Sequence, residues 1–283
     1  MNTDARPVAL VTGTSSGMGL HTAVELARRG LTVVATMRDT ARAGALTDAA
    51  GGAGVELDVR VLDVTDHEAA RSTVHGVLAD HGRLDVLVNN AGRGAVATAE
   101  QLSLDEIRDQ LEVNYLGPVA LTKLVLPHMR EAGAGTVLTV TSVGGAVGQP
   151  FADAYCGAKF AVEGFMQSLA VVMLPHGVRV SVVEPAAVAS DFVGNVARPD
   201  EVPYDPYAAQ LGAYLARSAG AFADAQSSRD AAVAIADAAL SGEYRFRWQT
   251  SEGATAFVGL SLGDTDGRRV LGVTRGWIET APN

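Results

Sequence analysis

The sequence is poor in the residues that several classes of protein depend on. Its only cysteine is Cys156, so an internal disulfide bond is excluded and a reducing compartment is expected. Aromatic residues make up 5% of the chain, and 22 basic residues face 32 acidic ones, for a formal net charge of −10. Because nucleic acids and anionic membranes repel negative charge, neither is expected as a partner.

Long apolar runs are also missing from the sequence. We find no uninterrupted stretch of about 20 apolar residues, the length that a membrane-spanning helix needs. Residues 1–7 are short and polar and do not resemble a signal peptide. With 283 residues, of which 48% are hydrophobic, the chain can bury a substantial core. These features predict a cytoplasmic globular protein with a small-molecule partner and no metal site.

A glycine-rich turn follows the first predicted strand. Residues 8–11 are all apolar, which is typical of a strand buried on both faces, and residues 20–29 have the pattern of a helix that ends at Gly30. Glycines in such a turn allow a phosphate to approach the backbone, and the helix start supplies free N–H groups. The turn can also be purely structural, but its position favours cofactor binding by Gly13, Ser15, Ser16, Gly17, Met18 and Gly19.

The end of the second predicted strand, residues 32–36, indicates which dinucleotide is bound. An acidic residue here would bind the ribose 2′-hydroxyl of NAD, but Thr36 and Met37 are not acidic, and Arg38 follows. The guanidinium fork of Arg38 suits a 2′-phosphate, with Ser16 as a second contact, so NADP(H) is predicted and NAD(H) is less favoured. Asp39 offers an alternative, since it can bind the ribose or pair with Arg38, and Arg38 can also be a solvated surface charge.

Two further strands complete the first half of the chain. Residues 51–54 (Gly-Gly-Ala-Gly) predict a flexible connection before a strand at 55–62, which ends at Asp63 and Val64. Asp63 can bond the adenine amino group, or it can cap the helix at 67–81, which Asp66 also can start. A strand at 84–88 runs into Asn89-Asn90-Ala91-Gly92, where the amides can bond neighbouring strands and Ala91-Gly92 lets the backbone pass close to a ribose, unless this is an ordinary turn. Four strand–helix alternations predict an α/β fold with a doubly wound parallel sheet.

The middle of the chain carries three polar residues in apolar surroundings. Residues 103–130 predict one long helix, which starts with a capping box of Ser103 and Glu106. Asn114 interrupts its apolar face and can hold a water that passes protons to Lys159, or simply bond a backbone carbonyl. Ser142 follows a fifth strand at 136–141, where ligands bind in such sheets, and it can donate to a substrate oxygen or serve as a cap.

Tyr155 and Lys159 are four residues apart on a predicted helix at 153–174. This spacing places them one turn apart on the same face. A lysine ammonium beside a phenol favours the phenolate, so we expect the pKa of Tyr155 to lie below the usual value of about 10. Such a tyrosine is a general acid/base for a carbonyl–alcohol pair. Cys156 has apolar neighbours and is interpreted as an inert core residue.

These motifs, in this order and at these spacings, resemble the short-chain dehydrogenase/reductase family over about residues 7–190. The resemblance implies that Tyr155 is the acid/base, that Lys159 lowers its pKa and binds the nicotinamide ribose, and that Ser142 polarises the carbonyl. It implies a proton relay through Asn114. A finer similarity, in Thr14–His21, Ala35–Asp39, Ser142–Gly145 and Tyr155–Gly164, is to the branch of 17β-hydroxysteroid dehydrogenase type 1 and the photoreceptor retinol dehydrogenases, which use NADP(H).

The segment after the sixth predicted strand, residues 178–184, departs from the family pattern. Ala186 stands where the family usually has glycine after Pro185, and Ser190 stands near the position of a threonine. The resemblance implies that Pro185 and Ser190 contact the cofactor and that the backbone of Val188 meets the nicotinamide carboxamide.

The last third is predicted to form the substrate side. Residues 191–227 contain three prolines and several aromatic residues, which is typical of a lid over a substrate, or of a surface loop with two short helices. No histidine occurs in this stretch, in contrast to the steroid enzymes. A helix at 230–240 and an edge strand at 244–248 follow, and residues 251–283 form a C-terminal extension with Trp277 that folds over the pocket or packs on a partner subunit.

Together these features predict a single NADP-binding Rossmann-type domain over residues 1–283, with about seven parallel strands and helices on both faces. The predicted function is an NADP(H)-dependent oxidoreductase, a ketoreductase or alcohol dehydrogenase that acts on CH–OH groups with NADP⁺ as acceptor. Its substrate is expected to be bulky and apolar, such as a steroid, a retinoid or a polyketide-like carbonyl. The alternatives are an NAD-linked alcohol dehydrogenase and a catalytically silent NADP-binding regulatory protein. The resemblance also implies a homodimer or homotetramer.

Overall fold

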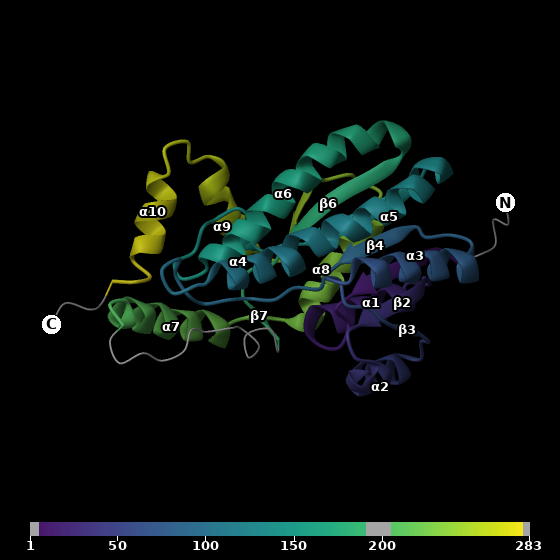
Figure 1. Ribbon diagram of the computed structural model, residues 1–283, viewed down its shortest axis with the longest axis horizontal. Coiled ribbons are helices and arrows are strands. Elements are labelled where there is room, and N and C mark those ends of the chain that lie inside the picture. The colour runs from purple at the N-terminus through teal and green to yellow at the C-terminus, as the bar shows by residue number, and fades with distance from the viewer. Residues whose placement is uncertain (1–5, 191–204, 280–283) are drawn as a thin grey trace.

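A seven-stranded parallel sheet forms the centre of the computed structural model, which describes residues 6–190 and 205–279 (Figure 1). Its strand order is β3-β2-β1-β4-β5-β6-β9. The strands are β1 (Val8–Thr12), β2 (Thr32–Met37), β3 (Asp58–Val61), β4 (Val86–Asn89), β5 (Gly135–Val140), β6 (Val178–Glu184) and β9 (Arg247–Gln249). The order reverses between β1 and β4, which opens a crevice at the carboxyl ends of these strands. The predicted doubly wound, Rossmann-type α/β fold is confirmed.

Helices cover both faces of this sheet and bury its apolar strands. On one face, α1 (Gly17–Arg28) packs on β1 and β2, with α2 (Gly44–Ala53) beside it, and α8 (Ser228–Leu240) packs against α1 and β5. On the other face lie α3 (His67–His81), α5 (Gly117–Ala132) and α6 (Asp153–Met173). All five residues of β1 are buried, because a parallel strand between two helix layers has no solvent-facing side.

The long helix predicted at 103–130 is interrupted by a wider turn. It consists of α4 (Leu104–Leu111), a π-helical turn η2 (Glu112–Leu116) and α5, which extends to Ala132. The predicted capping box at the start of α4 is present, with Ser103 and Glu106 bonding each other's backbone N–H. A π-helical turn changes the direction in which its side chains point relative to the rest of the helix. Among the residues of this turn, Asn114 is fully buried.

Two boundaries in the first half differ from the sequence prediction. Gly51 and Gly52, expected in a flexible connection, form the last turn of α2, and only Gly54 takes the left-handed conformation that ends the helix, with φ +68°. The strand expected at 55–62 is limited to Asp58–Val61, since this is the stretch that pairs with β2 at the sheet edge.

The chain after β6 builds a second group of helices beyond the sheet. Two short strands, β7 (Val188–Ala189) and β8 (Gln226–Ser227), pair with each other, and the helix α7 (Ala208–Ala223) comes between them in the sequence. After β9 the chain forms α9 (Glu252–Leu262) and α10 (Arg268–Arg275). Figure 1 shows α7, α9 and α10 together at the end of the molecule opposite α2. In its described part, residues 205–227, the predicted lid segment contains one helix of 16 residues, whereas residues 191–204 lie outside the described residues.

The stretch Asp153–His176, which begins with α6, is long and apolar enough to cross a membrane, although the sequence analysis found no such run. Length and composition are the only grounds for this, and the core helices of globular proteins meet the same criteria. In this fold α6 packs on the sheet through Val162, Met166 and Ala170, and it also buries Lys159 and Glu163. We therefore describe α6 as a core helix of the domain.

Candidate active site

A cleft of about 1230 Å³ runs along the carboxyl ends of the strands. It is larger than most single-ligand pockets, which enclose roughly 300–1,000 Å³, so it has room for a dinucleotide and a second molecule. Every predicted site residue except Asn114 lines this cleft: Gly13, Ser15, Ser16, Gly17, Met18, Gly19, Arg38, Asp63, Val64, Asn90, Ala91, Gly92, Ser142, Tyr155, Lys159, Pro185, Val188 and Ser190. The structure thus brings together residues that are up to 177 positions apart in the chain.

The glycine turn has a shape that side chains would prevent. Gly13 and Gly17 have positive φ angles of +70° and +59°. A Cβ atom on Gly13 would lie 2.8 Å from the Cα of Ala91, closer than atoms pack. The helix α1 begins at Gly17 without a side-chain cap from Ser16, so the amides of its first turn remain available for an anion. This arrangement fits the pyrophosphate of a dinucleotide.

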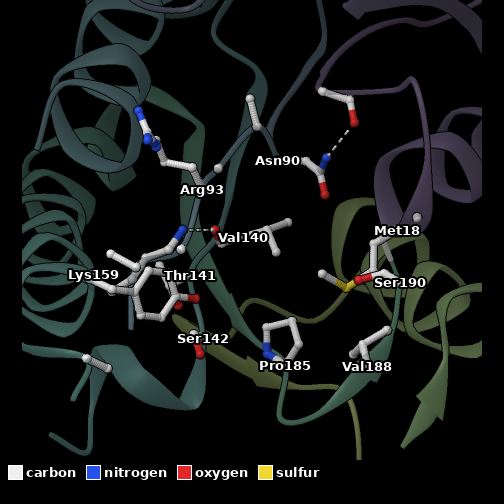
Figure 2. Close-up of a pocket in the computed structure, with 18 of the residues that line it drawn as sticks. Met18, Asn90, Arg93, Val140, Thr141, Ser142, Lys159, Pro185, Val188 and Ser190 are labelled. Carbon is white, nitrogen blue, oxygen red and sulfur yellow. Dashed lines mark hydrogen bonds between the residues drawn. The ribbon is translucent and has the colours of Figure 1, made fainter. Parts of the chain in front are cut away.

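Asn90 holds this turn against the end of β4. Its side-chain amide donates to the carbonyls of Thr12 at 2.8 Å and Gly13 at 3.2 Å. A Cβ atom on Gly19 would lie 2.3 Å from both the Asn90 Nδ2 and the Gly13 carbonyl oxygen. Figure 2 shows Asn90 across the cleft from Met18, Val188 and Ser190. The Asn90 amide therefore stabilises the glycine turn through these two hydrogen bonds, in agreement with the amide bonding predicted from the sequence.

Two arginines lie at the adenosine end of the cleft. Arg38 and Arg42 both line it, whereas Asp39 does not. The Asp39 carboxylate accepts from the N–H of Ala41 at 2.9 Å and so caps the short 3-10 turn η1 (Thr40–Arg42) that carries Arg42. Within residues 6–190 and 205–279, neither arginine has a carboxylate within 4 Å. Sequence reasoning missed Arg42; the signal was the capping aspartate three residues before it.

Asp66, and not Asp63, caps the helix α3, whereas Asp63 lines the cleft. The Asp66 carboxylate accepts from the N–H groups of Glu68 and Ala69 and starts α3. Asp63 instead accepts from the backbone N–H and the hydroxyl of Thr65, at 3.0 and 2.8 Å, and lines the cleft beside Val64. It is therefore placed in the cleft wall and does not cap the helix.

Ser142, Tyr155 and Lys159 meet at the middle of the cleft. The Ser142 hydroxyl accepts from the N–H of Gly144 at 3.0 Å and lies beside the Tyr155 phenol, whose pKa it acts to lower. The Lys159 ammonium donates to the Val140 carbonyl at 3.1 Å (Figure 2). It lies 5.8 Å from the centre of the Tyr155 ring. The hydroxyl pair and the ammonium are held by the end of β5 and the first turns of α6.

The pKa of Tyr155 departs from the sequence expectation. We expected Lys159 to lower it, but burial of the phenol raises its pKa, opposed by the hydrogen bond from Ser142. Burial also lowers the pKa of Lys159 to about 8, with the charge of Glu163 acting the other way. Desolvation of the phenol is thus the largest influence on its pKa and acts opposite to the effect expected of Lys159. In this state of the protein the phenol is held protonated.

Asn114 lies behind the cleft and does not line it. Its amide donates to the Arg93 carbonyl at 2.9 Å and to the Gln110 carbonyl at 3.1 Å, and its Oδ1 accepts from the N–H of Arg93 at 3.3 Å. The backbone-bonded alternative is therefore observed. Asn114 Oδ1 and Lys159 Nζ both lie within 4 Å of the point where Gly92 would carry a Cβ atom. A proton relay from Asn114 to Lys159 stays a prediction.

A buried charged cluster below Ser142 was not predicted from the sequence. Arg247 of β9 pairs with both Glu163 of α6 and Glu184 of β6, and these two glutamates are almost completely buried. Thr141, one residue before Ser142, bonds the Glu163 carboxyl through its hydroxyl at 2.8 Å. The cluster ties the end of β5 to α6 and β9. Its members are far apart in the sequence, so no local pattern indicates it.

The other end of the cleft is aromatic. It is lined by Tyr214 and Phe222 of α7, Phe257 of α9 and Trp277 after α10. Phe257 and Trp277 stack with ring centres 5.6 Å apart. Of the two alternatives for the C-terminal extension, the structure thus has Trp277 in the cleft wall. Within the described ranges no group of three or more His, Cys, Asp or Glu side chains is arranged to hold a metal ion.

Known proteins were compared with the chain and its fold. The family model described as short chain dehydrogenase matches residues 7–201. Human 17-beta-hydroxysteroid dehydrogenase type 1 is 42% identical over 205 residues, which are 70% of this chain and 62% of that protein. Retinol dehydrogenase 8 of Bos taurus is 43% identical over 197 residues, 68% of this chain and 62% of that protein. The chain therefore spans less than two thirds of the length of these relatives.

A solved structure extends the likeness to nearly the whole chain. The short-chain dehydrogenase from Streptomyces avermitilis superposes with a TM-score of 0.80 at 34% sequence identity, covering 98% of this chain and 99% of that one. The glycine turn, the strand-end serine and the tyrosine–lysine pair lie in the matched region. The chain thus belongs to the short-chain dehydrogenase/reductase family, whose members are nicotinamide-dependent oxidoreductases.

Proposed function

We propose that the protein is an NADP(H)-dependent oxidoreductase that interconverts a carbonyl and an alcohol on a bulky, largely apolar substrate. The observation that carries this proposal is that Ser142, Tyr155 and Lys159 meet in the middle of a cleft with a glycine turn at one end and an aromatic wall at the other. When bound, the nicotinamide ring would supply or accept the hydride at the substrate carbon. The chain itself supplies the proton and the oxygen contacts.

The proton chemistry follows from the environment of Tyr155. Burial keeps the phenol protonated, so it can donate its proton to a substrate oxygen as negative charge develops there. The Ser142 hydroxyl, held by the N–H of Gly144, orients the same oxygen and stabilises its charge. The Lys159 ammonium, held by the Val140 carbonyl, adds a positive charge near the developing anion. A tyrosine held as an acid favours carbonyl reduction as the working direction.

The arginines at the adenosine end support NADP(H) over NAD(H). Two guanidinium groups without carboxylate partners in the described residues face the cleft, and a 2′-phosphate would pair with them. Asp39, the residue that would favour a free ribose, is engaged with the backbone of Ala41 and lies outside the cleft wall. An NAD-linked enzyme would leave Arg38 and Arg42 without a charge to bind.

The substrate class is inferred from the aromatic wall. Tyr214 and Phe222 on α7, together with Phe257 and Trp277, offer aromatic rings to a substrate. We propose that the segment 191–227 acts as a lid, since it contains α7, and that the extension 251–283 completes the pocket as part of the same domain. A steroid, retinoid or polyketide-like carbonyl would fit such a wall.

We also infer a homodimer or homotetramer. Exposed apolar side chains follow one another along α6 at helical spacing, with Phe160 44% and Val171 71% exposed. Leu104 of α4 is 68% exposed. Sedimentation velocity of the protein with and without a Phe160→Asp/Val171→Asp double change tests this inference, because a charged pair in an apolar interface should yield monomers. A cytoplasmic location remains an expectation from the lone cysteine.

The test of the reaction is the loss of reduced-nicotinamide absorbance. The enzyme is mixed with NADPH or NADH and a panel of bulky ketones, aldehydes and quinones, with Tyr155→Phe alongside. We expect turnover with NADPH and a loss of roughly 10²- to 10⁴-fold in kcat for Tyr155→Phe, with NADPH affinity little changed. Tight NADPH binding without any turnover across the panel would favour a catalytically silent NADP-binding protein.

A further inference from the structure

Arg217 lies at the aromatic end of the cleft and has no anionic partner in the part of the chain that the structure describes. Among the described residues, four arginines line this cleft: Arg38, Arg42, Arg93 and Arg217. Arg38 and Arg42 lie at the adenosine end, where the proposed 2′-phosphate would meet them. Arg93 faces Asp109 at 3.8 Å. Arg217 is thus the one of the four whose counter-charge neither the described chain nor the proposed cofactor supplies.

The position of Arg217 is fixed by an aromatic contact. Its guanidinium carbon lies 5.2 Å from the centre of the Trp277 ring, a distance typical of a cation over an aromatic face. A guanidinium stacked in this way keeps its N–H edge free for a planar anion. Trp277 also carries an unused donor, since its indole N–H is buried and has no acceptor among the described residues. The Arg217 guanidinium and the Trp277 indole N–H are therefore two neighbouring hydrogen-bond donors for which the described residues supply no anion and no acceptor, respectively.

The same helix face joins this place to the reacting centre. Tyr214 and Arg217 are three residues apart on α7, about 4.5 Å along its axis, and both line the cleft. Tyr214 is close enough to Tyr155 to affect the pKa of that phenol. A substrate whose oxygen meets Tyr155 and whose body lies along Tyr214 would extend toward Arg217.

An arginine without a carboxylate partner is unusual in a chain with this many acidic residues. With 32 acidic and 22 basic residues, carboxylates outnumber cations, and most described arginines have one within 4 Å. Arg268 on the neighbouring helix α10, for example, pairs with Asp266 at 3.2 Å. The absence of such a partner at Arg217 leaves its charge available to a ligand.

We infer that the substrate carries an anionic group, of which a carboxylate is the simplest, on the side of its apolar body away from the reacting carbonyl, and that Arg217 binds it. This inference rests on the proposed function for the position of the carbonyl. It makes Arg217 a specificity-determining residue: it would bind acids in preference to their neutral esters, while Tyr155 and Ser142 act on the carbonyl itself.

The test compares acids with their methyl esters. The probes are 4-benzoylbenzoate and 6-oxo-6-phenylhexanoate, each beside its methyl ester, so that a rigid and a flexible spacing are both sampled. Binding is measured by calorimetry with the intact protein and NADP⁺, and reduction is measured separately with NADPH. Arg217→Met removes the charge and keeps an unbranched side chain. Arg268→Met removes one charge from the neighbouring helix as the matched control.

We expect the wild-type protein to bind at least one acid about 10- to 100-fold more tightly than its ester, the range for a charge-assisted hydrogen-bonded pair. Arg217→Met should abolish that preference and leave ester binding within about threefold, whereas Arg268→Met should keep it. Equal binding of acid and ester in both pairs would overturn the inference. So would equal loss of acid and ester in Arg217→Met, which indicates packing on Trp277, or a weaker NADP⁺ affinity with the acid preference intact, which indicates a cofactor contact.

Failure of the proposed function gives a different result. If the acids bind preferentially through Arg217 but neither acids nor esters are reduced, the anion site stands and the proposed reaction does not. If the esters are reduced with NADPH and show no difference from the acids, the reaction stands and the anion site is wrong.

Discussion

The Thr141 hydroxyl lies 2.8 Å from the Glu163 carboxyl and 3.0 Å from the Val183 carbonyl oxygen. A hydroxyl has one proton, so it can donate to only one of these oxygens. Both contacts are hydrogen bonds when Glu163 is protonated and donates to Thr141, which in turn donates to Val183. Burial and the nearby Glu184 raise the pKa of Glu163 to about 7, opposed by Arg247, in agreement with this geometry.

The first prediction concerns stability against pH. Because the folded-state pKa of Glu163 lies above its ordinary value of 4.5, the folded protein holds this proton longer than the unfolded chain, and the contribution to stability falls as the pH rises from 4.5 to about 7. Glu163→Gln lacks this loss. From pH 5 to pH 8, the difference in unfolding free energy between Glu163→Gln and wild type should therefore move by about 1–3 kcal/mol in favour of the variant.

Urea unfolding at both pH values measures this change, and Glu243→Gln is the matched control. Glu243 is 65% exposed and pairs with Arg245, so its replacement should leave the unfolding free energy nearly unchanged at either pH. An unchanged difference between wild type and Glu163→Gln across this range would show that Glu163 is ionised throughout.

The second prediction concerns the pH dependence of activity. Burial lowers the pKa of Lys159 to about 8, so its ammonium is present below that pH and is lost above it. Because kcat/KM for NADPH reports groups of the free enzyme, it should be level below pH 8 and fall about tenfold per unit above it. The Glu163 charge supports the Lys159 ammonium, so Glu163→Gln should move this midpoint to lower pH. A profile that stays level to pH 10 would contradict the role of the ammonium.

The third prediction separates NADPH from NADH. Arg38→Leu and Arg42→Leu should each weaken NADPH binding by about 10- to 100-fold, since a charge-assisted pair with the 2′-phosphate is lost. NADH binding should change by less than about threefold, because NADH lacks that phosphate. Reduced-nicotinamide fluorescence measures both affinities. Arg93→Leu, in the same cleft but paired with Asp109, is the control and should leave the NADPH-to-NADH ratio unchanged.

The fourth prediction concerns the glycine turn. A Cβ atom on Gly19 would lie 2.3 Å from the Gly13 carbonyl oxygen, so Gly19→Ala must displace the turn and should cost about 1–3 kcal/mol in unfolding free energy. It should also weaken cofactor binding. Gly157→Ala is the control, since Gly157 lies in α6 with no atom within 4 Å of an added Cβ, and alanine should there stabilise the protein by roughly 0.5–1 kcal/mol. Thermal melts with and without NADPH show both effects.

The sequence determined the fold because its signals are local. The apolar strand at 8–11, the strand at 178–184, the helix at 67–81 with Asp66 before it, and the capping box at Ser103 depend on neighbouring residues. The structure has all four as predicted. Many cleft residues follow for the same reason, since parallel strands end at one edge of a sheet. Those that come within two residues after a strand include Gly13, Arg38, Asp63, Asn90, Ser142 and Pro185, whereas Tyr155 and Lys159 are placed by α6.

Tertiary structure decided what depends on distant residues. Desolvation in the folded cleft raises the pKa of Tyr155, and no spacing along the helix reveals this effect. The cluster of Glu163, Glu184 and Arg247 joins three elements across the sheet. Trp277 reaches the cleft only because α10 folds back to α7, where it meets Arg217. Local sequence pattern fixes backbone conformation, whereas desolvation, charge pairing and the substrate wall arise only when segments far apart in the chain exclude water from one another.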